Sequence, residues 1–248
     1  MPSTIASSVA LDIAALADHS PCAAYKWKDR GVAPRGYIRG MAVMFGRVYC
    51  KLKADRDAAS ETAMADSGDG TVDALSWFKP EFDALGMDNS EAGVGVLRNV
   101  FVLLTGLGMR ESSGRHCEGR DMAATNADGT TAEAGLFQVS YNSHSAHFLL
   151  DALFDQYKGS TDFQDIFSDG VTCNTASWTN WGTGDGRDFQ ELIKTCPAFA
   201  VEYAALLLRK RRKHWGPINK KTAELRQECD DLFKAVCAHI DSNGISEV

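Results

Sequence analysis

Glu111 draws attention because it closes an otherwise apolar helix face with a carboxyl group. The positions that share this face recur at steps of three and four: Leu97, Val100, Leu104, Leu107 and Glu111. A carboxyl at the end of a buried stripe is partly desolvated, and desolvation raises its pKa. A carboxyl that keeps its proton near neutrality can serve as a general acid. The same periodicity also fits an exposed helix end with Glu111 turned towards solvent.

Two glycines interrupt the same predicted helix, which we expect over residues 91–112. Gly106 and Gly108 lie inside it, and each costs roughly 1 kcal/mol relative to alanine in a helix interior. This cost predicts that another part of the chain approaches the helix backbone closely at these positions. Gly114, just past the helix, is a suitable stop signal.

A second motif follows the glutamate. Residues 111–114 read Glu-Ser-Ser-Gly, and residues 133–140 read Glu-Ala-Gly-Leu-Phe-Gln-Val-Ser. Together they resemble the lysozyme-like superfamily, in which goose-type lysozymes and soluble lytic transglycosylases carry Glu-Ser at the end of a buried helix and Gly-Leu-Met-Gln-Val/Ile downstream. Residues 138–142, Gln-Val-Ser-Tyr-Asn, are also similar to the Gln-Leu-Ser-x-Asn of plant-type chitinases. The motif-bearing resemblance covers residues 94–142 and extends weakly through the helix that begins at Pro197.

The resemblance implies a mainly α, α+β lysozyme-like fold, with a helical core and a small β-hairpin edging a substrate groove. It also implies that Glu111 is the catalytic acid. We expect residues 76–248 to form the catalytic domain and residues 1–75, which resemble nothing we can name, to form an N-terminal helical extension. The Ala-Tyr-Asn-Ala-Gly block of lytic transglycosylases is missing: residues 178–182 and 214–217 match it poorly. This departure leaves hydrolysis and transglycosylation both open.

Glycoside hydrolysis normally uses two carboxyl groups. Glu133 is our candidate for the second, ahead of Glu118, Asp121 and Asp128, although a surface position for Glu133 is equally compatible with the sequence. Eight further residues could bind or stack on the sugar: Ser113, Gln138, Ser140, Tyr141, Asn142, Trp178, Trp181 and Tyr203. Their alternative roles are bonding the backbone of a buried hairpin or packing in the core.

These motifs predict a peptidoglycan-cleaving glycosidase, either a muramidase or a lytic transglycosylase, with one glutamate as general acid and no cofactor or metal. A chitinase- or chitosanase-type hydrolase of the same fold and a non-catalytic polysaccharide-binding module are the alternatives. A metalloenzyme using His144, His147 or His116 lacks a recognisable ligand motif. A thiol hydrolase built on Cys22 or Cys117 has no local signature either.

Composition narrows the class of partner. The chain of 248 residues has a net charge of −7, which argues against nucleic-acid binding. The basic run at residues 209–214 is read either as a solvated helix end or as attraction to an anionic polymer. No signal peptide or membrane-spanning stretch is visible, so we expect no membrane insertion. The location stays unknown, and export would need a non-classical route. We also expect the protein to be a monomer.

The remaining pattern is helical. We expect helices over residues 1–20, 37–52, 91–112, 144–158, 197–214 and 221–240, loops over 116–131 and 168–188, and a linker over 53–73. The seven cysteines cannot all pair internally. If the chain is exported, a disulfide such as Cys173 with Cys196 is possible.

Overall fold

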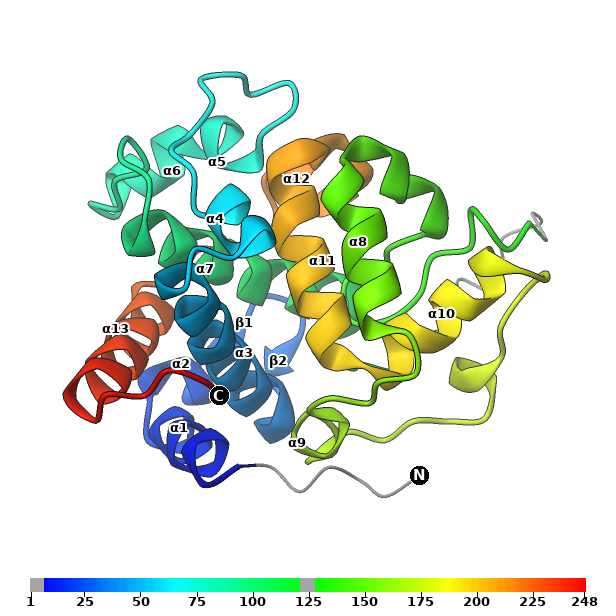
Figure 1. The fold of residues 1–248 in the computed structure, drawn as a ribbon, viewed down its shortest axis with the longest axis horizontal. Coiled ribbons are helices and arrows are strands. Elements are labelled where there is room, and N and C mark those ends of the chain that lie inside the picture. Colours follow the sequence, from blue (N-terminus) through cyan, green and yellow to red (C-terminus); the bar gives the residue numbers. More distant parts are fainter. Residues whose placement is uncertain (1–6, 121–127) are drawn as a thin grey trace.

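The computed structural model describes residues 7–120 and 128–248 (Figure 1). Helices account for 60% of the chain and strands for 3%, which confirms the mainly α class. Asp121, one of the candidates for a second carboxylate, lies outside the described residues. Among the helices that the structure describes, none is long and apolar enough to cross a membrane.

Seven helices and both strands precede the loop that carries the second motif. In chain order they are α1 (Ser8–Asp18), α2 (Pro21–Ala24), β1 (Lys26–Trp27), β2 (Gly31–Val32), α3 (Arg35–Lys53), α4 (Asp57–Thr62), α5 (Ala74–Trp77), α6 (Lys79–Ala84) and α7 (Val94–Ser112). Helix α7 bears Glu111. It packs against α3, α11, α12 and α13, which surround most of its length.

The second half of the chain is also helical. Its elements are η1 (Tyr141–Ala146), α8 (Phe148–Tyr157), α9 (Gln164–Ser168), η2 (Ala176–Trp178), α10 (Asp185–Thr195), α11 (Pro197–Lys210), η3 (Arg212–His214), α12 (Gly216–Asn219) and α13 (Gln227–Ser242). The predicted helix over 144–158 is divided at His147, whose extended backbone separates η1 from α8. We did not predict helix α10 from the sequence, because its first turn lies in a stretch rich in Gly and Asp that we assigned to the loop over 168–188.

Helix α7 ends where the sequence placed its end. Ser113 adopts a left-handed conformation with φ of 56°, and its N–H donates to the Met109 carbonyl at 3.1 Å. This 5→1 bond from a left-handed residue is the αL type of helix ending, and the Gly114 N–H donates to the Gly108 carbonyl at 3.2 Å.

The close approach predicted at the two helix glycines is confirmed. A Cβ added to Gly106 would lie 2.1 Å from the backbone oxygen of Glu224. One added to Gly108 would lie 2.4 Å from the Tyr37 hydroxyl oxygen and 3.1 Å from the ring of Phe137. Gly108 therefore lets a helix from the N-terminal part and the loop of the second motif meet against α7.

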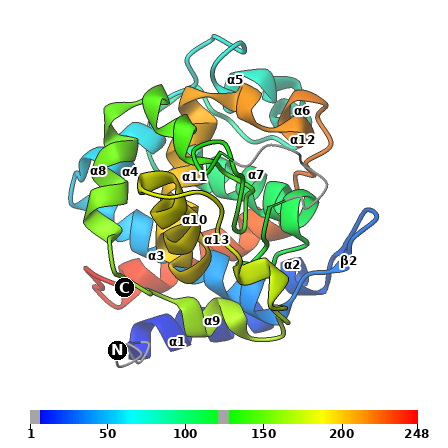
Figure 2. The same ribbon diagram turned by 90° about the vertical axis from the view of Figure 1, so that its right-hand side faces the viewer.

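The β-structure lies elsewhere than expected. Strands β1 and β2 form a two-stranded antiparallel hairpin near the N-terminus, which protrudes from the helical body (Figure 2). In the described part of residues 116–140, the pairing is a single bridge between Ala134 and Val139. The four residues between them form a tight turn. Three of its carbonyls bond to side chains from other elements, so these residues do not pair with a strand.

Residues 53–73 are not a free linker. The buried guanidinium of Arg209 forms two bonds with the Asp73 carboxylate, at 2.9 and 3.1 Å, and further bonds with the carbonyls of residues 62, 64 and 65. Buried residues from Ala10 to Ile240 form one hydrophobic cluster. The proposed division at residue 75 stays a prediction, although both parts share this core.

The basic run at 209–214 has a different role from either interpretation of the sequence. Arg209 and Arg212 are buried. Arg212 donates to the Gly70 carbonyl and lies over the Trp77 ring at 4.1 Å, while Lys210 pairs with Glu61. Arg209, Lys210 and Arg212, half of the run, therefore hold the 61–73 segment in place and are unavailable to an anionic polymer.

The cysteines pair differently from the example we considered. Cys22 bonds to Cys229, and Cys117 bonds to Cys173. Cys196 is a buried free thiol. Both candidate nucleophiles of the thiol hydrolase, Cys22 and Cys117, are thus consumed in disulfides.

The close approach of the Glu224 backbone to Gly106 predicts that a side chain at position 106 lowers the stability of the fold. Gly106→Ala should destabilise the protein by about 1–3 kcal/mol, because the new methyl group meets backbone that cannot rotate away. The matched control is Gly95→Ala, which has open space around it and should be neutral or stabilising by up to about 1 kcal/mol. Urea unfolding followed by circular dichroism measures both. Equal stability of the two variants would contradict the close packing.

Candidate active site

Glu111 lies in the last turn of α7 and is half-buried. Desolvation, and secondarily the charge of Glu133, raise the pKa of its carboxyl to about 7. Arg30 and Arg110 oppose this shift but do not cancel it. Within the described residues, no hydrogen bond or ion pair engages the carboxylate. The group is therefore available to a ligand and holds its proton near neutrality.

Glu133 is the second carboxyl of the site. Its residue surface is exposed, yet the carboxyl itself is partly surrounded by protein, and desolvation raises its pKa. It precedes the Ala134–Val139 bridge and is close enough to Glu111 for its charge to act on that group. The structure thus brings the two predicted catalytic residues together.

The loop of the second motif is tied to the acid helix by Ser112. The Ser112 hydroxyl lies 2.8 Å from the Leu136 carbonyl oxygen and 3.0 Å from that of Gly108, and it donates to this pair of acceptors. Ser112 is buried. The serine of the Glu-Ser motif therefore fixes the loop relative to the glutamate beside it, a role that we did not assign from the sequence.

The next two carbonyls of this loop also have donors. The Trp215 indole N–H donates to Phe137 at 2.7 Å, and His214 Nε2 lies 3.3 Å from the Gln138 oxygen. The Gln138 side chain donates to the Gly135 carbonyl at 3.1 Å. Positive φ angles at Gly135 (75°) and Gln138 (48°) make the turn tight. Gln138 therefore has a structural role here, which was one of its two predicted roles.

Arg30 and Arg110 border the acid, and no sequence motif pointed to Arg30. Arg30, on the hairpin between β1 and β2, donates to the Arg110 carbonyl and, at 3.4 Å, to the Ser113 hydroxyl. Arg110 donates to the Lys28 carbonyl at 3.2 Å. The hairpin thus docks on the end of α7. The Ser113 hydroxyl is a partner of Arg30, and its role in sugar binding stays a prediction.

A second group of predicted residues lies on and around η1. The Ser140 hydroxyl donates to the Asn142 side chain at 2.9 Å, and the Asn142 N–H donates to the Thr130 carbonyl. Tyr203 is fully buried, with its hydroxyl 2.9 Å from that of Ser143. Among the described residues, no hydrogen bond or ring contact joins Tyr203 to Glu111, so core packing is its observed role.

Tyr141 remains partly exposed. It stacks on His144 with ring centroids 4.5 Å apart, and its hydroxyl lies 3.4 Å from an Asp185 oxygen. His144 in turn contacts Asp151 at 2.7 Å, whereas His147 accepts the Leu149 N–H as a helix cap. The two histidines therefore serve separate local structures and do not converge as metal ligands.

The two tryptophans lie in the loop before α10. Trp178 is 37% exposed and makes an edge contact with His116, so it can offer a stacking surface. Trp181 is half-buried, and the Arg120 guanidinium covers its ring at 4.4 Å. No hydrogen bond or ring contact joins either to Glu111 in the ranges 7–120 and 128–248. Their stacking role stays a prediction.

The remaining carboxylates are less suited to catalysis. Glu118 pairs with Arg115. Asp128 is exposed, and bonds from Thr130 hold the pKa of its carboxyl below its usual range. Glu133 therefore remains the best candidate for the second group among the described residues.

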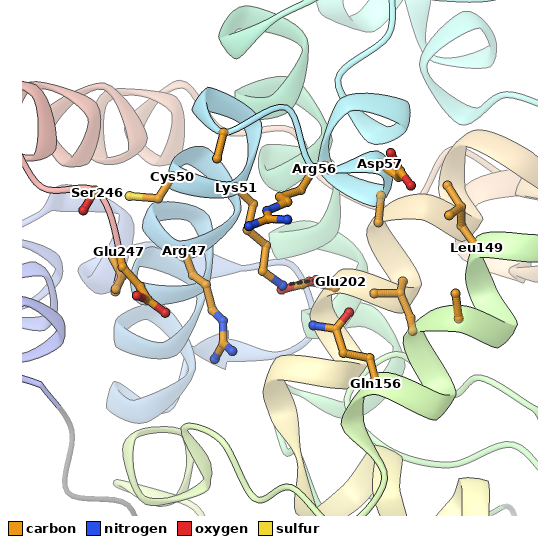
Figure 3. A pocket seen from close by; sticks show the side chains of 16 residues that line it. Arg47, Cys50, Lys51, Arg56, Asp57, Leu149, Gln156, Glu202, Ser246 and Glu247 are labelled. Carbon is orange, nitrogen blue, oxygen red and sulfur yellow. Dashed lines mark hydrogen bonds and ion pairs between the residues drawn. The ribbon is translucent and has the colours of Figure 1, made fainter.

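A cavity of about 640 Å³ lies away from these residues (Figure 3). It is bordered by α3, α4 and α8, and Lys51 and Glu202 form an ion pair at 2.6 Å within it. Tyr157 donates to the same Glu202 carboxylate at 2.8 Å. Neither Glu111 nor Glu133 lines this cavity. Because neither proposed catalytic carboxyl borders this cavity, it is not the site of the proposed chemistry.

The raised pKa of Glu111 predicts how stability depends on pH. Between its ordinary value of 4.5 and about 7, the folded protein binds more protons than the unfolded chain, so stability falls as pH rises through this window. Glu111→Gln removes the ionisable group. It should leave stability at pH 5 nearly unchanged and raise it at pH 8 by up to about 3 kcal/mol.

Urea unfolding at the two pH values measures this effect. Glu191→Gln is the control, because Glu191 is an exposed glutamate on α10 and its removal should give no gain at pH 8. A Glu111→Gln variant without a pH-dependent gain would show that the Glu111 carboxyl is well solvated.

Comparisons with known proteins add no assignment. No protein-family model matches the chain. Searches of curated proteins and of solved structures gave no match either. The interpretation of the site therefore depends on its own geometry and on the two short motifs.

Proposed function

We propose that this protein cleaves the glycosidic bonds of peptidoglycan, with Glu111 as the general acid. The observation that carries the proposal is the desolvated Glu111 carboxyl, with a pKa of about 7, beside a second carboxyl and next to the loop at 135–138. Two neighbouring carboxyls, one of them protonated near neutrality, are typical of glycoside-cleaving sites.

The chemistry follows from these protonation states. Protonated Glu111 gives its proton to the glycosidic oxygen as the bond to the anomeric carbon breaks. In its ionised form, Glu133 balances the positive charge on the sugar ring and, in a hydrolase, removes a proton from the attacking water. In a transglycosylase the sugar's own hydroxyl attacks instead, and a second carboxylate is not needed. Arg30 and Arg110 stabilise Glu111 once it has lost its proton.

The acid role predicts the effect of a single substitution. Glu111→Gln should lower kcat on purified peptidoglycan by about 10²–10⁴-fold, the usual contribution of a general acid, while cosedimentation with insoluble peptidoglycan is retained. Glu191→Gln should behave as the unsubstituted protein.

For the unsubstituted protein, kcat/KM should fall above pH 7 as Glu111 loses its proton. Full activity of Glu111→Gln would exclude the proposed acid. Cleavage of chitin oligomers but not of peptidoglycan would favour the chitinase-type alternative, and binding without cleavage of either polymer would favour a binding module.

Glu133→Gln separates the two reaction types. In a hydrolase that uses Glu133 as base, this variant should lose about 10²–10⁴-fold in kcat. In a transglycosylase it should stay active and release anhydro sugars. Mass spectrometry of the products reads the difference directly, because anhydro products are lighter by one water. A variant that is active and yields only hydrated products would show that Glu133 has no role as the base.

A further inference from the structure

A cluster of three metal-ligating side chains lies outside the proposed catalytic pair. The ligand atoms of His116, Cys117 and Cys173 all lie within 4.8 Å of one another, and the two cysteines form a disulfide. His116 Nε2 lies 3.9 Å from Cys173 Sγ. Across residues 7–120 and 128–248, this is the one group of three such side chains close enough to share an ion.

The histidine is oriented as a metal ligand would be. Its Nδ1 lies 2.9 Å from the backbone oxygen of Lys194, which can only accept. Nδ1 therefore carries the proton, and the lone pair is on Nε2, which faces Cys173 and lies 3.1 Å from the Ser168 hydroxyl. Metal-binding histidines commonly donate their other N–H to a backbone carbonyl in this way. His116 and Cys117 are each 1% exposed, so the arrangement is built into the fold.

We propose that reduction of the Cys117–Cys173 disulfide creates a zinc site whose ligands are these two thiolates and His116 Nε2. A dithiol reductant breaks the S–S bond, supplies two electrons and two protons, and is itself oxidised to a disulfide. The two cysteines become thiols, and zinc binding then releases their two protons. Two thiolates and an imidazole are a ligand set that favours zinc.

The backbone is already spaced for this conversion. Two thiolates on a tetrahedral zinc, with Zn–S bonds of about 2.3 Å, lie about 3.8 Å apart. The Cα atoms of Cys117 and Cys173 are 5.9 Å apart, so rotation of the side chains opens the sulfurs to that distance. The fourth position is left to water or to the Ser168 hydroxyl. Cys173 is only partly buried, which gives a reductant access.

The other cysteines lack this arrangement. Cys22 and Cys229 are both buried and have no histidine or carboxylate completing a group of three among the described residues. Reduction there yields two thiols only. Because only the 117–173 pair has a histidine beside it in the described part of the chain, we expect zinc to bind there and not at the 22–229 pair.

The site also has a structural consequence. It joins the segment that follows Glu111 to the segment that leads into Trp178, whose ring contacts His116. Disulfide and zinc would hold the same two segments together under oxidising and reducing conditions respectively. This inference does not depend on the proposed glycosidase activity.

Zinc titration of the full chain tests the proposal. The protein is reduced with a water-soluble phosphine, its thiols are counted, the phosphine is removed without oxygen, and Zn²⁺ is titrated in competition with a chromogenic chelator. We expect one tight zinc in the reduced protein and none in the oxidised protein. Co²⁺ in place of Zn²⁺ should give the absorption of a tetrahedral site with thiolate ligands.

Variants separate this site from other thiols. His116→Gln keeps all seven cysteines, and it should weaken zinc binding at least about 100-fold, since even an outer-shell partner contributes 10–100-fold. Cys173→Ser removes a ligand without altering buried His116 and should show the same loss. His239→Gln, a histidine on α13, is the matched control and should bind as the unsubstituted protein. The proposal is overturned if the reduced protein binds no zinc, if either ligand variant binds as tightly, or if the 117–173 disulfide resists reduction in the folded protein.

Discussion

The desolvation of Glu111 depends on how closely other segments pack around the last two turns of α7. Glycines at 106 and 108 leave room for the backbone at Glu224 and for the rings of Tyr37 and Phe137. Side chains at these positions would push those segments away and admit water to the end of the helix. Close packing therefore comes first, and the raised pKa of the carboxyl follows from it.

The loop at 135–138 is held by donors from distant parts of the chain. Ser112 comes from the acid helix itself, and Trp215 comes from the segment after α11. Because the Leu136 and Phe137 carbonyls are bonded to these side chains, the loop has one conformation and forms no extended hairpin. Rigid support of this kind is what a catalytic carboxyl needs to keep its geometry.

Buried charge organises the rest of the molecule in a similar way. Arg209 satisfies Asp73 and three backbone carbonyls at once. It thereby fixes a polar segment that has little apolar surface of its own. A buried guanidinium is tolerated only when its donors are used in this manner. The basic run around it therefore serves the fold, and a count of its charges gives a misleading picture of the surface.

The sequence alone determined the local features: the α7 stripe that ends in Glu111, the helix end at Ser113 and the need for close approach at the two glycines. Periodicity, capping and glycine cost are properties of neighbouring residues, so they can be read without coordinates. The tertiary structure decided the features that depend on contacts between residues far apart in the sequence. Arg30 reaches the Arg110 carbonyl, next to the acid, across 80 residues of sequence, and its hairpin has no local signal that points to Glu111. The pairing of Cys117 with Cys173, rather than of Cys173 with Cys196, likewise depends on which loops meet in space.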